Sequence, residues 1–415
     1  MQDENKPGLF YGWVVVAITV LALLVSAGVR AAPGVLIVPL EQDTGWSRTL
    51  IATAISVGLL LFGFAGPFAG WLLDRLGPRP VMLGGLALMA ASMVASALMR
   101  APWQMLLFWG AVSGLATGLV GAVMGTAVAN RWFYARRGLV LGIFGAATSA
   151  GQLIFLPAVA LAAVSVGWRG ASVLLAVLAA ALLPLVFLLM RNTPADAGTL
   201  PFGLTQALPA PATPPSALAV MGVALRSPAF WLLATTFFIC GATSNGLVGT
   251  HFVPHAVDHG IAHATAAGTL ALMGLMNFVG TLGSGWLTDR YDPRRLLAIY
   301  YGFRGISLLF LPFVTSLPGL AFFAILFGLD YIATVPPTAA LVADSFGRHN
   351  AATVFGWVFC AHQIGAALAA WLGGVARDLT GGYAVAFLVA GALAIAATGL
   401  SLGIRRAPVP APAAD

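Results

Sequence analysis

Charged residues are scarce in this chain. They make up only 8% of its 415 residues, whereas 60% of the residues are hydrophobic and the mean hydropathy is +0.95. A soluble globular chain of this length does not normally reach such values. The composition therefore excludes a soluble protein, because so much apolar surface has to face lipid.

Cysteine is also scarce, and both residues, Cys240 and Cys360, fall within long apolar stretches, so a disulfide framework is unsupported. The chain has no G-x-x-x-x-G-K-[ST] phosphate-binding loop. No nucleophile, base and orienting residue fall into one plausible set. We therefore expect no ATP-driven pump, no enzyme and no cofactor. The first residues, MQDENKPGLFYGW, lack a basic segment followed by a short apolar core and a cleavage site, so we expect no cleaved signal peptide.

Long apolar stretches recur along the whole chain, and each could cross the roughly 30 Å hydrocarbon layer as a helix of about 20 residues. We predict twelve such helices. Their approximate bounds are 12–38, 49–73, 80–99, 104–130, 138–163, 170–190, 228–256, 264–288, 296–316, 319–342, 353–375 and 382–404. The sequence therefore predicts an all-α integral membrane protein surrounded by the lipid bilayer.

The basic residues are unevenly distributed between the segments that join these helices. With the N-terminus inside, most of the 20 Lys and Arg residues fall on the predicted inner side. Positive charge on the cytoplasmic side is the usual signature of membrane topology, so the formal charge of +7 gives no reason to expect a nucleic-acid partner. We predict a multi-pass protein of the cytoplasmic (inner) membrane with both termini in the cytoplasm.

One short charged stretch occurs twice. GWLLDRLGPRP, Gly70–Pro80, has a near copy in GWLTDRYDPRR, Gly285–Arg295, and the two lie about 215 residues apart. An internal duplication of six helices is the simplest explanation. We therefore predict two pseudo-symmetric six-helix halves, 1–191 and 228–415, joined by a Pro- and Ala-rich cytoplasmic linker over 192–227.

These two stretches resemble the loop signature of the major facilitator superfamily. Three others, YGWVVV, GVLIVPLEQDTGWSR and ANRWFYARRGLVLGI, look like the branch of monocarboxylate porters and oxalate/formate exchangers. The resemblance implies the major facilitator fold and secondary active transport of small organic anions by alternating access, either together with a proton or in exchange for another anion. It also implies that the loop residues latch neighbouring helices and the two halves together on the inner side. The candidates for this gating role are Asp74, Arg75, Arg79, Asp289, Arg290 and Arg294. Plain topology-determining charges are the alternative, but they would explain neither the aspartates nor the repetition.

The sequence departs from this branch at one position. Its members typically carry an Arg four residues before the glycine that opens the second loop signature, where it neutralises the substrate carboxylate. Thr281 stands there in this chain, and Asn277 stands one turn earlier, where several relatives have an acidic partner. Arg30, in the first predicted helix, is the candidate that replaces the missing cation, because a fixed charge within a span is costly unless it has a use. Alternatively, Arg30 reaches the outer interface or bonds only to carbonyl groups.

Two other charged residues fall within predicted spans. Asp330 is the only acidic residue deep in a span, and we predict that it carries the coupling proton. Arg304 could instead form a purely structural ion pair with it. The remaining candidates for substrate binding are polar residues in helices expected to line a central cavity or at the outer end of the seventh helix: Asn245, His251, His255, Asn277, Tyr331, His362 and Gln152. A zinc site built on the four histidines at 251, 255, 259 and 263 lacks an acidic or cysteine ligand that would complete a recognised pattern, so we expect no metal.

Two other functions stay open. The missing Arg and the many aromatic residues in the spans also suit a proton-coupled exporter of amphiphilic compounds. A transporter-like membrane sensor would need a sizeable cytoplasmic module, and the segment 192–227 is short. The partners that we expect are a small organic anion and either a proton or a counter-transported anion, with the protein acting as a monomer.

Overall fold

The computed structural model describes residues 10–46, 48–206 and 217–404. Lys6, Arg405 and Arg406, which contribute to the predicted inner charge, lie outside these residues. The described chain is helical and contains no strand beyond a single bridge between Phe133 and Phe202. An all-α protein is therefore confirmed.

The helices form two bundles. The first bundle consists of α1 (Gly12–Thr44), α2 (Arg48–Leu76), α3 (Pro78–Ala97), an interrupted helix made of α4 (Pro102–Gln104), η1 (Met105–Val112), α5 (Ser113–Leu119) and α6 (Ala122–Trp132), and α7 (Arg137–Leu189). A short turn, η2 (Pro194–Ala197), and a short helix, α8 (Ala217–Leu225), lie between the bundles in the sequence.

The second bundle repeats this plan. It consists of α9 (Pro228–Gly241), η3 (Ala242–Val248), α10 (Gly249–Asp258), α11 (His263–Thr288), α12 (Pro293–Phe310), η4 (Leu311–Phe313), α13 (Leu317–Asp330), α14 (Val335–Phe346), η5 (Arg348–Asn350), α15 (Ala351–Thr380) and α16 (Ala384–Leu402).

Eleven helices of the described chain are long and apolar enough to cross a membrane. The count differs from the predicted twelve because α7, with 53 residues, covers both the fifth and the sixth predicted span. The chain turns inside α7 at Gly167, whose φ of 73° is readily adopted only by glycine.

The indole N–H of Trp168 donates a hydrogen bond of 2.9 Å to the carboxylate of Asp43, at the end of α1. This bond, together with one from Arg169, holds the pKa of Asp43 below its usual value.

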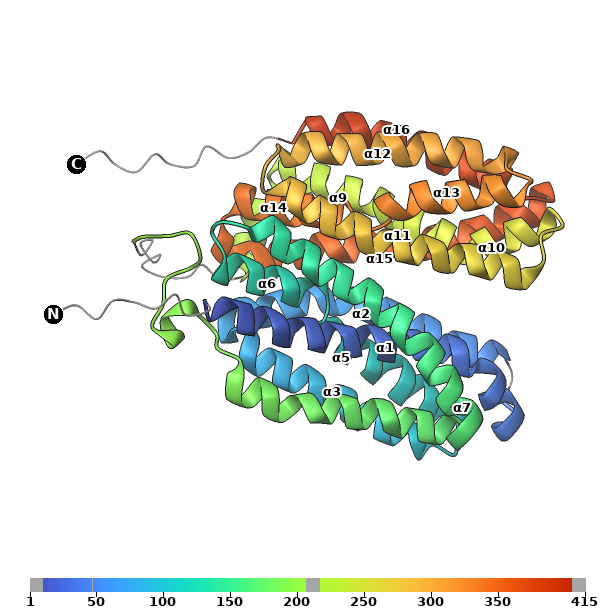
Figure 1. The fold of residues 1–415 in the computed structure, drawn as a ribbon, viewed down its shortest axis with the longest axis horizontal. Coiled ribbons are helices and arrows are strands. Elements are labelled where there is room, and N and C mark those ends of the chain that lie inside the picture. The colour runs from blue at the N-terminus through green and yellow to red at the C-terminus, as the bar shows by residue number, and fades with distance from the viewer. Residues whose placement is uncertain (1–9, 47, 207–216, 405–415) are drawn as a thin grey trace.

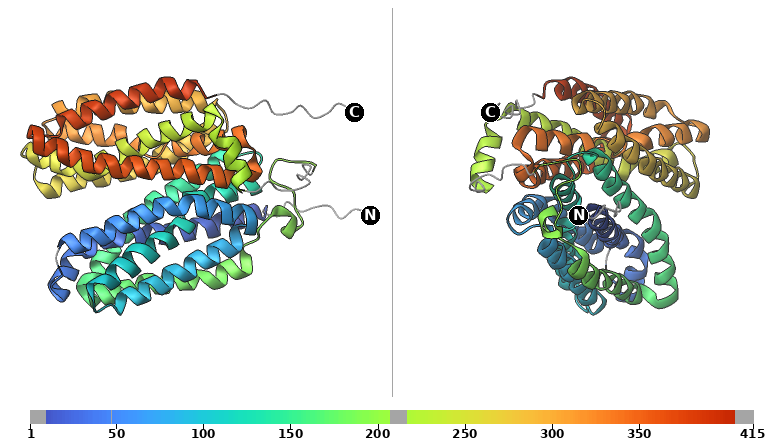
Figure 2. Two further views of the ribbon diagram at one scale, coloured as in Figure 1. Left: turned by 180° about the vertical axis from the view of Figure 1, so that it is seen from behind. Right: turned by 60° about the vertical axis from the view of Figure 1, so that its left-hand side comes forward.

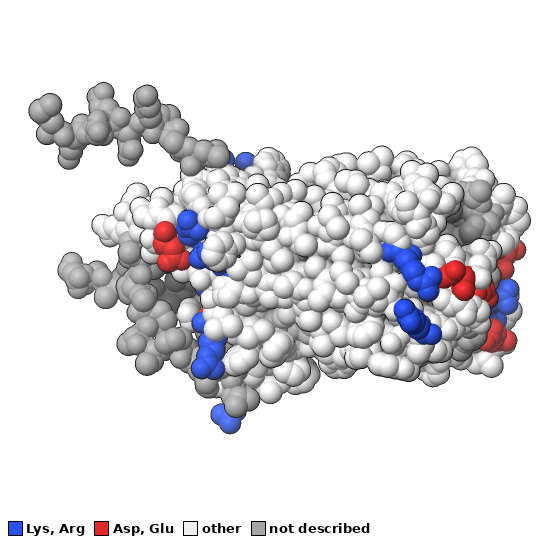
Figure 3. Space-filling view, turned by 90° about the horizontal axis from the view of Figure 1, so that it is seen from below, with Lys and Arg blue, Asp and Glu red and all other residues white. Residues whose placement is uncertain are grey.

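The two bundles lie close together at one end of the molecule and diverge toward the other (Figures 1 and 2). We call the first of these ends the α1 end, because α1 begins there and α16 finishes there (left in Figure 1). Charged side chains gather toward the two ends, and a broad uncharged band separates them (Figure 3). Such a band is what a bilayer requires of the surface that it covers.

Three crossing segments are interrupted near the middle of the molecule. The fourth breaks at Val120 and Gly121, between α5 and α6. The seventh widens into the π-helix η3, and the tenth loses its regular helix between α13 and α14. Pro336 and Pro337 explain the last break, because neither can donate the backbone N–H that would continue the helix. Irregular backbone at membrane depth is tolerated where it lines a cavity, so these breaks point to the functional site.

Candidate functional site

A cavity of about 140 Å³ lies between the two bundles, and two further hollows of about 410 and 580 Å³ adjoin it. The 410 Å³ hollow runs between α7 and α11. The 580 Å³ hollow lies between α2 and the distant part of α15, near Trp371. All three interrupted segments contribute to the cavity, through Gly121, Asn245 and Tyr331. The breaks therefore place backbone and side chains directly around this space.

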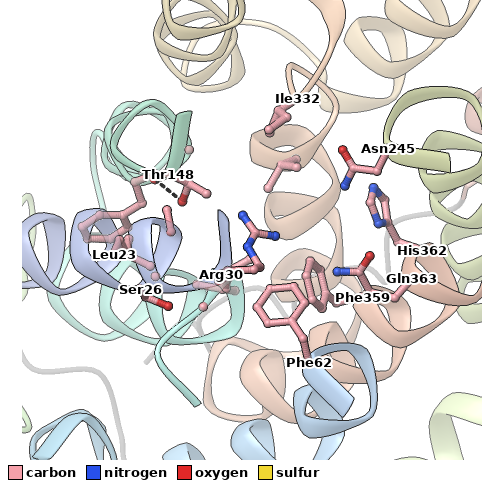
Figure 4. Close-up of a pocket in the computed structure, with 18 of the residues that line it drawn as sticks. Leu23, Ser26, Arg30, Phe62, Thr148, Asn245, Ile332, Phe359, His362 and Gln363 are labelled. Atoms are coloured by element: carbon pink, nitrogen blue, oxygen red, sulfur yellow. Dashed lines mark hydrogen bonds between the residues drawn. The ribbon is translucent and has the colours of Figure 1, made fainter. Parts of the chain in front are cut away.

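Arg30 is the only Lys or Arg among the residues that line the three hollows, and no Asp or Glu lines them. Its guanidinium lies over the ring of Phe62, 4.8 Å from the ring centre. Within the described part of the chain, it has no hydrogen-bonding or ionic partner. Figure 4 shows Arg30 extending from α1 into the middle of the cavity. The site is therefore a sheltered cavity with one fixed positive charge, which no acidic side chain of the described residues balances.

The wall that faces Arg30 is made of polar side chains on aromatic supports. Asn245 from η3 and His362 and Gln363 from α15 lie together on this side (Figure 4). His362 is only 6% exposed, and its ring stacks on that of Phe359, with 5.8 Å between the ring centres. Its Nδ1 atom is buried and has no hydrogen-bond partner in the described chain. Such an atom can bond to a ligand without first breaking a bond within the protein.

Asn277 and Gln152 also line the cavity, whereas Thr281 does not. Asn277 donates from its Nδ2 to Ser149 Oγ at 2.8 Å, across the two bundles. Its Oδ1 accepts from Thr281 Oγ1 at 3.0 Å and from the backbone N–H of Ile332 at 3.2 Å. Asn277, supported by Thr281 within α11, thus joins α11 to α7 and to the broken tenth segment.

His251 and His255 do not line any of the three hollows. Both are buried inside the second bundle. His251 donates from Nε2 to the carbonyl of Ala370 at 2.8 Å, and His255 donates from Nε2 to the carbonyl of Leu311 at 3.3 Å. Their common helical face, on which the prediction rested, packs against neighbouring helices.

Arg304 and Asp330 form a buried ion pair, with 2.6 Å between Arg304 Nε and Asp330 Oδ2 and side-chain exposures of 0% and 3%. The structural partnership left open by the sequence is therefore present. Neither residue lines the three hollows. Asp330 Oδ1 is buried without a hydrogen-bond partner in the described chain. The predicted role of Asp330 in proton coupling stays a prediction.

The two repeated aspartates join the bundles at the α1 end. Asp74, at the end of α2, accepts hydrogen bonds from the backbone N–H and hydroxyl of Thr353, at 3.0 and 2.6 Å. Asp289, at the end of α11, accepts from the backbone N–H groups of Gly138 and Leu139, at 2.6 and 2.8 Å. Each carboxylate therefore meets the N-terminus of a helix of the other bundle, α15 or α7, where unpaired N–H groups and the helix dipole favour negative charge.

The opening glycines of the repeated stretches explain how the bundles come close enough for these contacts. A Cβ atom on Gly70 would lie 2.4 Å from the carbonyl oxygen of Ala352, and one on Gly285 would lie 2.4 Å from the carbonyl oxygen of Gly138. Any larger residue would push the two backbones apart. The repeated stretch thus combines a close-approach glycine with a capping aspartate four residues later.

The four loop arginines make a different kind of contact. In the described chain, Arg75 lies over the Trp71 ring and Arg290 over the Trp286 ring, while Arg294 pairs with Asp292 at 2.6 Å. Arg79 bonds to the carbonyl of Phe187 and, through its backbone N–H, to Asn192. These contacts stay within one bundle or reach the start of the segment that follows α7.

Sequence reasoning missed several residues that join the bundles or line the cavity. Arg137 forms an ion pair of 2.8 Å with Asp344, and Arg348 donates to the carbonyls of Phe133 and Tyr134. One signal was available in the sequence. Arg137 begins α7 and Arg348 lies just before α15, and the internal duplication relates these two helix starts to each other. The aromatic lining residues, such as Phe62, carried no signal of their own among 25 phenylalanines.

The chain was compared with known proteins. A family model described as Major Facilitator Superfamily matches residues 19–370 and 252–415. Human monocarboxylate transporter 11 is 29% identical over 98% of this chain and 85% of its own length. The oxalate:formate antiporter of Oxalobacter formigenes is 26% identical over 91% of this chain and 87% of its own length.

A solved structure shares the fold. The fucose:proton symporter of E. coli superimposes with a TM-score of 0.75, at 16% identity, over 96% of this chain and 100% of its own. Together with the eleven apolar helices, this likeness confirms the predicted membrane fold of two helical bundles around a central cavity.

Proposed function

This chain is a member of the major facilitator superfamily of membrane transporters, and from that premise we propose that it carries a small organic anion across the membrane by alternating access. The names of its relatives, which include monocarboxylate transporters and an oxalate:formate antiporter, support an organic anion as the substrate class. We further propose that it acts as a monomer in the cytoplasmic membrane with both termini in the cytoplasm.

The unbalanced charge of Arg30 is the observation that carries this proposal. A guanidinium at membrane depth costs roughly 2.5 to 3.5 kcal/mol on insertion scales. An incoming carboxylate would offset this cost, because its two oxygens match the planar fork of N–H donors. The polar groups of Asn245, His362 and Gln363 face Arg30 and would bind the remaining polar atoms of the substrate.

The charge of the lining also limits the charge of the substrate. Arg30 is the only fixed cation that lines the three hollows, so one carboxylate is neutralised and a second would be sheltered without a partner. The aromatic rings of Phe62 and Phe359 offer apolar surface for the body of the substrate. The transported species is therefore a monoanion with an apolar or aromatic body rather than a dianion.

The contacts between the bundles support alternating access. Asp74 and Asp289 close the α1 end, whereas the hollow near Trp371 extends from the cavity toward the opposite end. With the α1 end facing the cytoplasm, as proposed, the described state is outward-open. Release of the two aspartates would accompany the rocking of the bundles that opens the cavity toward the cytoplasm. The driving force is either a proton or exchange for a second anion.

Replacing Arg30 tests the proposal. We expect Arg30→Ala to weaken binding of a monocarboxylate such as benzoate by at least about 2 kcal/mol, roughly thirtyfold, because a charge-assisted bond in a sheltered cavity is lost. Arg30→Lys should recover part of the affinity, since it keeps the charge but loses the fork. Uptake into proteoliposomes and calorimetry of the purified protein would measure both. Arg100→Ala is the matched control, because Arg100 is exposed and lies outside the cavity.

A series of acids of different charge separates the outcomes. Acetate, lactate, benzoate and phenylacetate should compete with one another, whereas oxalate and succinate should compete at least about tenfold less well. Equal affinity of parent and Arg30→Ala for benzoate would contradict the role of Arg30. Stronger binding of succinate than of benzoate would contradict the proposal that the substrate is a monoanion.

The second candidate function is the proton-coupled export of amphiphilic compounds. One observation favours it: the hollow between α7 and α11 is lined largely by apolar residues, including Leu153, Leu156, Pro157, Leu270 and Met273. In that case neutral and cationic amphiphiles would bind the parent protein and Arg30→Ala equally well. Binding in the same calorimetric assay therefore distinguishes the two functions.

A further inference from the structure

Arg304 is a buried residue outside the cavity, and two of the irregular segments that line the cavity meet at its side chain. These segments are the π-helix η3, which carries Asn245, and the break after α13, which begins with Tyr331. In both segments the regular pattern of backbone hydrogen bonds is interrupted, so carbonyl groups lose the N–H partner that a regular α-helix would provide. In the middle of a membrane protein, such groups need a partner from within the protein.

The first set of bonds joins Arg304 to the break after α13. Its Nη2 donates to the carbonyl of Asp330 at 2.8 Å and to the carbonyl of Tyr331 at 3.1 Å. Its Nε donates to the carboxylate of Asp330 at 2.6 Å. The guanidinium is thus a second donor to the carbonyl of Asp330, which also accepts from the backbone N–H of Ala333 at 3.1 Å, and it bonds to the carbonyl of Tyr331 just beyond α13, at the negative end of the helix dipole.

The second set of bonds joins the same guanidinium to the start of the π-helix. Nη1 of Arg304 donates to the carbonyl of Cys240 at 3.4 Å, to its Sγ at 3.1 Å and to the hydroxyl of Thr243 at 3.2 Å. Cys240 Sγ in turn lies 3.0 Å from Thr334 Oγ1, at the far end of the break after α13. Arg304 therefore bonds to η3 through Thr243 and to the last turn of α9 through Cys240, and Cys240 in turn contacts the far end of the break after α13.

We propose that Arg304 is a positioning residue that fixes η3 and the break after α13 relative to each other, and thereby sets how Asn245 and Tyr331 face the cavity. Asp330 balances the charge that this arrangement requires. The effect on the backbone is independent of what the protein carries, whereas the effect on anion binding rests on the proposed function.

The shape of the guanidinium explains why arginine stands here. Its three nitrogens lie in one plane and point donors in fixed directions, so one side can bond to Cys240 and Thr243 while the other bonds to Asp330 and Tyr331. An ammonium group would keep the ion pair but could not reach both segments. Arg304→Lys therefore separates the charge from the bridge.

Hydrogen–deuterium exchange of the purified, membrane-embedded protein tests the bridge without any ligand. In Arg304→Lys we expect amide exchange to accelerate at least about tenfold in both 242–248 and 331–335, because both segments lose their shared donors. The break at Val120 and Gly121 should exchange as in the parent, since Arg304 does not contact it. Faster exchange in 331–335 alone would overturn the proposal, as would no change in either segment.

A second variant keeps the test decisive if Arg304→Lys does not fold. Thr243→Val conserves shape but removes one acceptor on the η3 side. We expect exchange to accelerate, by about threefold, in 331–335 as well as in 242–248. Thr236→Val is the matched control, because Thr236 is a buried hydroxyl of α9 that bonds to Leu232 and not to Arg304. An effect of Thr243→Val confined to 242–248 would contradict the coupling.

A double-mutant cycle extends the test to binding, with benzoate as the probe. Arg304→Lys should weaken benzoate binding about tenfold in the parent but less than threefold in Asn245→Ala, because the residue that it positions is already gone. Equal losses in both backgrounds would show that Arg304 acts only through general stability. If the parent does not bind benzoate, the proposed function fails for this probe, and the exchange experiment still decides the role of Arg304.

Discussion

Two arginines of this protein lie deep within its apolar band, and their surroundings differ completely. Arg304 is fully buried and donates to Asp330, Tyr331, Cys240 and Thr243. Arg30 touches the face of Phe62 and has no hydrogen-bonding or ionic partner among the described residues. The contrast separates a charge that maintains structure from one that is available to a ligand, a distinction that sequence position alone does not reveal.

The stability of the Arg304 pair gives a prediction at this scale. Asp330→Asn leaves a buried guanidinium without its counter-charge, so we expect the free energy of unfolding to fall by about 3 to 5 kcal/mol. Asp292→Asn breaks a partly exposed pair with Arg294 and should cost less than about 1 kcal/mol. Thermal unfolding of the two purified variants measures the difference.

The same variant bears on proton coupling. If Asp330 carries the coupling proton, Asp330→Asn should abolish acid-driven uptake and retain anion exchange. An Asn variant as stable as the parent would contradict the expected destabilisation. A double variant in which Arg304 and Asp330 are both replaced by uncharged residues provides the contrary outcome. If its transport still depends on pH, Asp330 is not the proton carrier.

At the scale of elements, the two repeated stretches act as one device at two symmetric places. In each, a glycine brings two helices of different bundles into backbone contact, and an aspartate four residues later caps a helix of the other bundle. The contact of α2 with α15 and that of α7 with α11 therefore close the same end together. Loss of either contact should weaken the closed state.

Gly285→Val tests this closure. The new side chain would meet the carbonyl of Gly138, so we expect the population to shift toward the state open at the α1 end. Spin labels at Ala135 and His349, both exposed at this end, should report a longer distance. The native cysteines are buried and should not take up the label.

Gly84→Val is the control for that experiment, because a Cβ atom on Gly84 meets open space. Its distance distribution should match that of the parent. An unchanged distribution in Gly285→Val would mean that the glycine contact does not maintain the closed end.

The helices, their repetition and the position of the two aspartates could be predicted from the sequence, since each depends on local pattern: apolar runs, an internal repeat and charges in short loops. The turn inside α7 at Gly167 lies between the predicted spans 138–163 and 170–190, so its place could be predicted, although regular helix continues close to it on both sides. His251 and His255 share a helical face as predicted, but which neighbours that face packs against depends on the tertiary arrangement. The ion pair of Arg304 with Asp330 was one of two alternatives that the sequence left open, because the residues are 26 positions apart and the packing of α12 against α13 brings them together.

At the scale of the whole molecule, the charged ends and the uncharged band define an axis (Figure 3). The uneven distribution of Lys and Arg along the sequence predicts its direction. The α1 end should face the cytoplasm. The bundles lie closest at this end, so the proposed orientation makes the described state one that admits substrate from outside.

Cysteine labelling in intact cells tests this orientation. Thr250→Cys, exposed in the hollow toward the opposite end, should react with a membrane-impermeant maleimide from outside. Tyr134→Cys, 48% exposed at the α1 end, should react only after permeabilisation. The reverse pattern would contradict the predicted topology, and equal labelling of both would show that the molecule inserts in two orientations.

The backbone pairing of Phe202 with the loop before α7 affects how freely the bundles can move. Phe202 donates to the carbonyl of Trp132 and accepts from the N–H of Tyr134, so the chain after α7 is fastened to the first bundle as far as this residue. The helix α8 packs against α9 and α15 of the second bundle. One stretch, 203–216, joins these two anchored points, and its 14 residues span at most about 50 Å. Two separately translated fragments, divided within it, should still assemble into a working transporter.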